Sequence, residues 1–131
     1  MKRRKVRFGI SLPEELARKL NTLSSMFGTD RSTLVAEALA EFLHNKSHVL
    51  ESHPCEGVFM VAYRFEERER ITEVLRAFDE VIVTRMHTHS KQGYCVEVAY
   101  ARGSSEEIAR LERELRRAKA LSVRYIACEI R

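Results

Sequence analysis

The chain has 131 residues, of which 44% are hydrophobic and 32% are charged, and its net charge at pH 7 is +4. The length suits one ordinary domain or two small ones, the composition excludes a mostly disordered or fibrous chain, and no apolar run approaches the roughly 18 residues of a membrane span. The basic N-terminus lacks the apolar segment of a signal peptide, and the three cysteines have no disulfide-framework spacing, so we expect a cytoplasmic protein with free thiols.

The excess positive charge lies at the N-terminus. The first twelve residues contain no acidic side chain and five basic ones, which are Lys2, Arg3, Arg4, Lys5 and Arg7. The other 119 residues therefore carry a net charge of −1. A localised basic arm of this kind either binds phosphate groups or acts as a solubilising tail.

Residues 5–12 alternate between polar and apolar side chains, which predicts a β strand with one buried face. Two helices are expected to follow. Pro13 suits the first turn of one helix and Gly28 its C-terminal cap. Asp30 or Ser32 can cap the second helix.

One strand and two helices are too few to close a core, and a lone strand leaves both of its edges unpaired. We therefore expect a two-fold dimer in which the strands of two chains pair antiparallel. The polar row of each strand would then lie on an exposed ribbon, and this row consists of Arg7, Gly9 and Ser11. The ribbon would be flanked by the basic arms, in which we single out Arg3, Arg4 and Lys5. A two-stranded ribbon fits the DNA major groove.

The run Arg7 to Pro13, the helix after it and the Asp30-Arg31-Ser32 start of the next helix resemble the ribbon-helix-helix family of DNA-binding domains. This resemblance implies a DNA-binding domain at residues 1–45. The alternative is a small dimeric helical module that only contacts other proteins.

Residues 46–56 break the helical periodicity and contain Pro54, so we expect a linker between two domains. A solvated linker is favoured because no metal-ligand spacing repeats in this region. The alternative is a metal site formed by His44, His48, His53 and Cys55.

The remainder, residues 57–131, is predicted to contain strand, helix, strand, strand, helix and strand. The strands are expected at residues 58–65, 81–89, 94–101 and 121–130, one helix at 67–78, and the other from the capping-box sequence that begins at Ser104. This βαββαβ order is typical of the ferredoxin-like fold and matches ACT-type ligand-sensing domains. The predicted fold class of the chain is α+β.

The strongest chemical signal is His87-Thr88-His89 followed by Cys95. On a strand, His87 and His89 point to the same face. If the hairpin places His89 opposite Cys95, then His87 lies opposite Glu97, and all four side chains share that face. Two imidazoles and a thiolate suit nickel, copper, zinc or cobalt. The alternative is a polar strand face on which the histidines are hydrogen-bonded and the cysteine is a small apolar residue.

The order of these modules and the H-x-H-x5-C pattern resemble the NikR-type nickel-responsive repressors. This resemblance implies that His87, His89 and Cys95 bind one Ni²⁺ per subunit, with Glu97 in support. It also implies a homotetramer, built as a dimer of dimers, that binds a palindromic double-stranded operator. The family's fourth ligand is a histidine from a neighbouring subunit, and Arg76 stands at that position here.

A guanidinium group does not bind metal, so we expect the fourth coordination position to be empty, filled by water or supplied from elsewhere. The outside candidates are His53, Cys55, Asp79 and Glu80. A metal-responsive repressor without enzyme activity is the leading interpretation. The second is a DNA-binding regulator whose C-terminal domain no longer senses nickel, and either binds another metal or a small molecule or only oligomerises. An enzyme is disfavoured because no nucleophile elbow, phosphate loop or dinucleotide motif is present.

Overall fold

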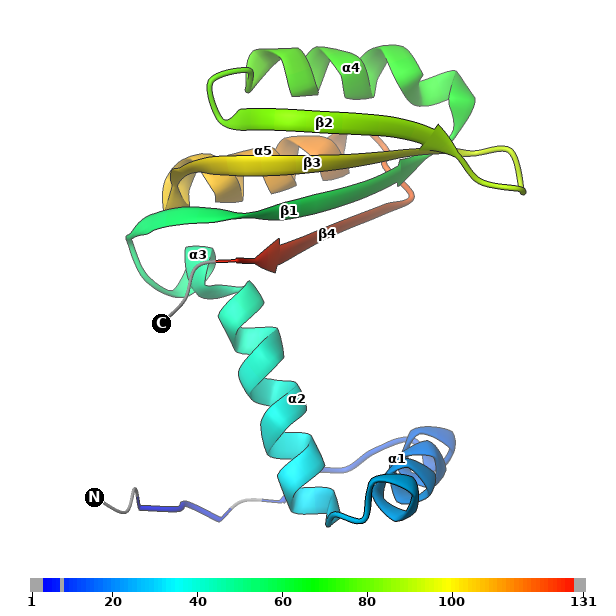
Figure 1. Cartoon of the computed structure of the whole chain (residues 1–131), viewed down its shortest axis with the longest axis vertical. Helices are drawn as coiled ribbons and strands as arrows, with labels where there is room; N and C mark the ends of the chain where they lie inside the picture. Colours follow the sequence, from blue (N-terminus) through cyan, green and yellow to red (C-terminus); the bar gives the residue numbers. More distant parts are fainter. Residues whose placement is uncertain (1–3, 8, 129–131) are drawn as a thin grey trace. The chain divides into compact units, whose positions relative to one another are not determined.

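The computed structural model describes residues 4–7 and 9–128 (Figure 1). The chain divides into two compact units, Met1–Glu41 and Phe42–Arg131. The first contains α1 (Glu14–Phe27) and most of α2 (Arg31–Asn45), at the positions predicted for the two helices. The caps are also those expected. Gly28 has a positive φ of 63° after α1, and the Asp30 carboxylate accepts a hydrogen bond from the Thr33 backbone N–H at 2.7 Å.

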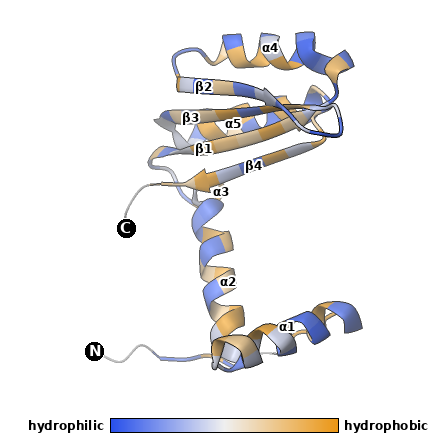
Figure 2. Ribbon diagram, turned by 45° about the vertical axis from the view of Figure 1, so that its right-hand side comes forward, coloured by the Kyte–Doolittle hydropathy of each residue, from blue (hydrophilic) through white to orange (hydrophobic). Residues whose placement is uncertain are grey.

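The first unit has very little core of its own. No residue of α1 is buried, and Leu34 is the one buried residue of α2. Hydrophobic residues nevertheless recur along both helices (Figure 2), and Leu16, Leu23 and Leu39 are exposed. The dimer that the sequence predicts would cover such residues with a second chain.

The strand predicted over residues 5–12 is not formed within the chain, as far as residues 4–7 and 9–12 show. A strand needs hydrogen bonds from a neighbouring strand, and the expected neighbour is the same segment of a second copy. Arg3 and Phe8 lie outside the described residues.

The second unit is built around a four-stranded sheet with the order β2-β3-β1-β4. The strands are β1 (Pro54–Tyr63), β2 (Ile82–His89), β3 (Cys95–Ser104) and β4 (Ser122–Ala127). The helices are α3 (Ser47–Leu50), the short 3-10 helix η1 (Phe65–Glu67), α4 (Arg68–Ala77) and α5 (Ser105–Arg117). From β1 onward the order is the predicted βαββαβ, and all strand pairs are antiparallel. The α+β prediction is therefore confirmed. Of the predicted last strand, residues 129 and 130 lie outside the described residues.

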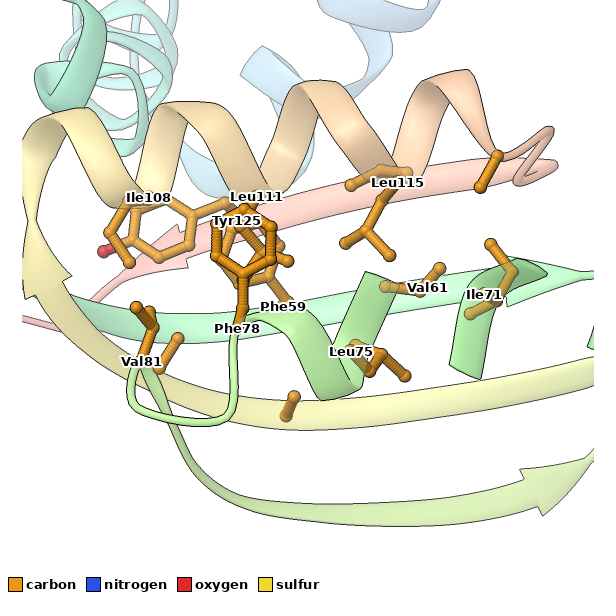
Figure 3. Close-up of a cluster of buried hydrophobic side chains, with 14 of the residues drawn as sticks. Phe59, Val61, Ile71, Leu75, Phe78, Val81, Ile108, Leu111, Leu115 and Tyr125 are labelled. Carbon is orange, nitrogen blue, oxygen red and sulfur yellow. The ribbon is translucent and has the colours of Figure 1, made fainter. Parts of the chain in front are cut away.

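The core of this unit lies between one face of the sheet and the two long helices. Phe59 and Val61 of β1 meet Leu75 of α4 and Leu111 and Leu115 of α5 (Figure 3). The predicted capping box at the start of α5 is present: the Ser104 hydroxyl accepts from the Glu107 N–H, and the Glu107 carboxylate accepts from the Ser104 N–H. No helix of the second unit covers the other face of the sheet among residues 42–128, and this uncovered face includes exposed Met60, Met86 and Ile126.

Residues 46–56 were expected to form a solvated linker, but part of this segment is folded and buried. Residues 47–50 form α3, and Ser47 and His48 are buried. The His48 Nε2 atom lies 3.0 Å from the Glu112 carboxylate of α5, which anchors this segment to the second unit. The contact was not foreseen because the two residues are 64 positions apart in the sequence.

Candidate functional site

The β2–β3 hairpin brings the predicted metal ligands together. Its register pairs His89 with Cys95 and His87 with Glu97, which meets the condition that the sequence analysis set for a shared face. Because residues i and i+2 of a strand share a face, all four side chains point to the helix-covered side of the sheet. The turn between the strands includes Gly93, whose φ of 88° suits glycine.

The donor atoms of His87, His89 and Cys95 converge. One ligand atom from each residue can be chosen so that all three lie within 4.8 Å of one another. The two Nε2 atoms are 3.3 Å apart, and the imidazole rings meet edge to face. Two nitrogens bound to one ion at about 2.0 Å would be about 2.8 to 3.3 Å apart, depending on the geometry. The spacing and the mixed nitrogen and sulfur donors therefore fit a borderline divalent ion such as nickel.

A buried carboxylate orients the first of these histidines. Glu97 is 5% exposed, and one of its oxygens lies 2.6 Å from Nδ1 of His87. When Nδ1 is the protonated nitrogen of His87, its N–H donates a hydrogen bond to the Glu97 carboxylate. The lone pair of Nε2 is then available to bind a metal ion. The Tyr63 hydroxyl also donates to Glu97 at 3.0 Å.

Burial, followed by the hydrogen bond to Glu97, raises the pKa of Tyr63, so the phenol remains a protonated donor. Tyr63 was not singled out in the sequence, although it is the residue of β1 that pairs with Cys95. It belongs to a separate strand 32 positions before Cys95, and only the order of strands in the sheet brings the two together.

The three candidate donor residues line a cavity of about 680 Å³ between α4 and the end of β2. Arg76 of α4 lines this cavity within the same chain as the donors, together with Glu69 and Glu73 of the same helix. Arg85 of β2 also lines it. Arg76, which the resemblance in the sequence places at the position of the fourth ligand, therefore lines the candidate site, and its guanidinium group brings a positive charge rather than a donor atom.

The other candidates for a fourth ligand lie elsewhere in the chain. Cys55 pairs with Gly103 and Tyr63 with Cys95, so Cys55 and His53 are at the opposite end of β1, about 26 Å away along the strand. Asp79 and Glu80 come just before β2, whereas the donors are at its end. Neither pair converges with the donors within one chain.

The predicted DNA-binding residues that the structure describes are all exposed, namely Arg4, Lys5, Arg7, Gly9 and Ser11. A Cβ atom added at Gly9 would meet no heavy atom within 4 Å. Arg3 lies outside the described part of the chain. These residues are therefore accessible, and their arrangement on a two-chain ribbon stays a prediction.

Among the described residues, no helix combines the length and the apolar character that crossing a bilayer would require.

Two family models match the chain. The NikR C-terminal nickel-binding domain matches residues 57–126, which is more than half of the chain, and a ribbon-helix-helix domain matches residues 4–45. The first match covers most of the sheet and the three candidate donors, and the second covers the basic arm from Arg4 onward and the helices α1 and α2.

Similar proteins carry the name "Putative nickel-responsive regulator". One from Dictyoglomus turgidum is 26% identical over 84% of this chain and 84% of its own length. Another, from Methanocaldococcus jannaschii, is 29% identical over 80% of this chain and 78% of its own. An uncharacterized protein from Thermotoga maritima superimposes with a TM-score of 0.54 at 12% identity, covering 59% of this chain and all of the other, and shows a shared fold alone.

Proposed function

The chain belongs to the family of nickel-responsive transcriptional regulators that share the NikR C-terminal nickel-binding domain, and on this premise we propose that it is a repressor controlled by nickel. Its N-terminal ribbon-helix-helix domain is a DNA-binding domain, and the family is one of regulators rather than enzymes. The observation that carries the proposal is the convergence of His87, His89 and Cys95 on one side of the sheet. We expect the protein to act in the cytoplasm, where thiols stay reduced.

In this proposal, each subunit holds one Ni²⁺ through His87, His89 and Cys95, while Glu97 and Tyr63 keep His87 in the metal-binding tautomer. The metal site would lie at the tetramer interface of the C-terminal units, where a bound ion would bias the ribbon-helix-helix dimers toward the arrangement that binds the operator. The affinity for DNA then depends on the metal to the extent that the DNA-competent arrangement binds metal more tightly.

We propose a homotetramer, in which two ribbon-helix-helix dimers are joined by the C-terminal units. The exposed apolar residues of α1 and of the uncovered sheet face support self-association through two separate surfaces. Two dimers within one assembly suit an operator with two palindromic half-sites. In each dimer, Arg7 would contact a base edge, Ser11 a base or phosphate, and the arm residues Arg3, Arg4 and Lys5 the phosphate backbone.

The experiment is a titration of the reduced full-length protein with Ni²⁺, followed by thiolate-to-nickel absorption in the near ultraviolet. We expect a saturable band at one metal ion per chain that is absent from Cys95→Ser. Cys128→Ser is the matched control, because Cys128 is exposed and lies outside the cluster, and it should retain the band. No band, or a band that survives Cys95→Ser, would contradict the proposal.

One observation favours a second function. Arg76 lines the candidate site, and a guanidinium group does not complete the coordination of a metal. In this alternative, the C-terminal unit no longer senses nickel. It either binds another metal or a small molecule, or only oligomerises. DNA binding that responds to neither chelators nor Cys95→Ser would support this alternative.

A further inference from the structure

Two guanidinium groups in the donor cavity, those of Arg76 and Arg85, form no hydrogen bond or ion pair with a described residue, although the charge of Arg85 acts on nearby Tyr63. Arg85 lies two residues before His87 on β2 and shares its face, and Arg76 reaches the cavity from α4. Neither guanidinium donates a hydrogen bond or forms an ion pair with any described residue. The neighbouring Arg68 instead donates to the Phe65 carbonyl and stacks on the Phe65 ring.

The charges around the cavity leave a positive excess once a divalent ion is present. Its lining holds three guanidinium groups, from Arg68, Arg76 and Arg85, and three carboxylates, from Glu69, Glu73 and Glu97. These six charges cancel. A thiolate at Cys95 and a divalent ion then add one net positive charge, which a single small anion would balance.

The donor count points the same way. His87, His89 and Cys95 supply three donors, whereas nickel and zinc sites of this donor type have at least four. The fork of an arginine side chain binds two oxygens of a carboxylate, so one anion can contact both a guanidinium group and an ion. The cavity of about 680 Å³ has room for both.

We propose that this cavity is a composite site for a divalent metal ion together with a small oxyanion, in which Arg76 and Arg85 bind the anion and the anion supplies the missing donor. The inference rests on the proposed nickel site and deepens it. The class of ligand is a carboxylate or an inorganic oxyanion of similar size. In this proposal Arg76 does not bind the metal ion itself, but binds the anion that supplies the fourth donor atom.

The test measures the dissociation constant of Ni²⁺ from the full-length reduced protein by the thiolate-to-nickel band. Titrations are made in perchlorate alone and, at equal ionic strength, with acetate, bicarbonate or inorganic phosphate. We expect at least one of these anions to tighten nickel binding by about tenfold and to shift the band. A gain with acetate or bicarbonate alone would identify a carboxylate-type ligand, and a gain with phosphate as well would identify a general oxyanion site.

The variants Arg76→Gln and Arg85→Gln should each reduce the ratio of the dissociation constants without and with the anion towards one. Arg70→Gln is the matched control, because Arg70 belongs to the same helix, does not line the cavity, and should leave the ratio unchanged. The ratio is the measured quantity, so a change in nickel affinity common to both conditions does not affect the result.

If the nickel band forms but the dissociation constant of Ni²⁺ is the same with and without each of the three anions, this inference is overturned and the proposed function stays intact. A ratio of one combined with weaker nickel binding in Glu73→Gln would also overturn it, because the fourth donor would then be the Glu73 carboxylate. The absence of any nickel band in the wild-type protein would overturn the proposed function itself, and this inference with it.

Discussion

At the scale of single residues, Glu97 decides which nitrogen of His87 faces the candidate metal position. Its carboxylate is buried, lies 2.6 Å from Nδ1 of His87 and accepts a second hydrogen bond from Tyr63. The carboxylate thereby holds the imidazole in one tautomer and one orientation. Glu97 contacts a candidate metal ligand but is not itself one. Its removal should therefore weaken metal binding although the donor atoms of His87, His89 and Cys95 remain.

Glu97→Ala should therefore weaken nickel binding by about 10- to 100-fold, which is the usual cost of losing such a partner. Glu97→Gln keeps an acceptor oxygen for Nδ1 but loses the charge, so its loss should be smaller. Competition between the protein and a chelator of known affinity measures both effects. Equal affinity in Glu97→Ala and the wild type would show that this carboxylate does not act on the metal ligands.

Arg7 is the residue expected to read the operator. Arg7→Ala should lower the preference for the specific operator by about 1–3 kcal/mol while non-specific binding persists, because one side chain that contacts a base edge is lost. Gel-shift titrations on operator and scrambled duplexes give this difference. Lys5→Ala is the comparison: it should weaken binding to both duplexes alike and lower the salt dependence by about one unit. Unchanged discrimination in Arg7→Ala would exclude the assignment.

At the scale of the elements, α3 is fixed to α5 by contacts that centre on the buried Glu112 carboxylate. The Glu112 carboxylate contacts the fully buried His48 side chain at 3.0 Å, Arg116 at 3.3 Å and Lys46 at 3.4 Å. The hydrogen bond from His48 has the largest effect, and with the charge of Lys46 and the hydrogen bond from Arg116 it outweighs the opposing effect of burial and lowers the pKa of Glu112 to about 2. The start of the predicted linker is therefore a packed part of the second unit rather than a free segment.

This cluster makes stability depend on acid pH. The pKa of Glu112 is lower in the folded state than its ordinary value of 4.5, so its stabilising contribution is complete above about pH 4.5 and is lost as the pH falls towards 2. Glu112→Gln should be less stable than the wild type by roughly 2–4 kcal/mol at pH 7, because it leaves buried groups without their charged partner. Unfolding curves between pH 3 and pH 7 should converge as the pH falls.

Glu114→Gln is the matched control for Glu112→Gln, because Glu114 lies on the same helix and pairs only with the exposed Arg117 among the described residues. It should cost less than about 1 kcal/mol at every pH. A stability difference for Glu112→Gln that did not change between pH 3 and pH 7 would contradict the role given to its charge.

At the scale of the whole molecule, the uncovered sheet face is the surface expected to join two dimers. Met60 and Ile126 lie on this face and are 44% and 47% exposed. Ile126→Asp places a charge on an apolar surface and should reduce a tetramer to a dimer, as measured by sedimentation velocity. Leu121→Asp, at a residue that is 49% exposed and precedes β4, is the control and should leave the mass unchanged. A tetramer that persists in Ile126→Asp would place the contact elsewhere.

Local pattern was sufficient for much of this protein. The alternation of residues along two strands joined by a short turn placed His87 and His89 on one face, and the structure then showed the register that pairs His89 with Cys95 and His87 with Glu97. Caps at Asp30 and Ser104 and the helical periodicity likewise predicted the helices, because these signals act over a few residues. The three candidate metal ligands and their neighbour Glu97 could be named from the sequence in this way.

The tertiary structure decided what depends on distant segments. Tyr63 reaches Glu97 because β1 lies beside β3, and Arg76 faces the donors because α4 lines the same cavity. His48 is buried against Glu112, 64 residues away, where the sequence alone favours a solvated linker. Such contacts follow from the order of strands and the packing of helices, and no spacing along the chain encodes them. The sequence by itself therefore identified the candidate donors, whereas the fold decided which charges surround them.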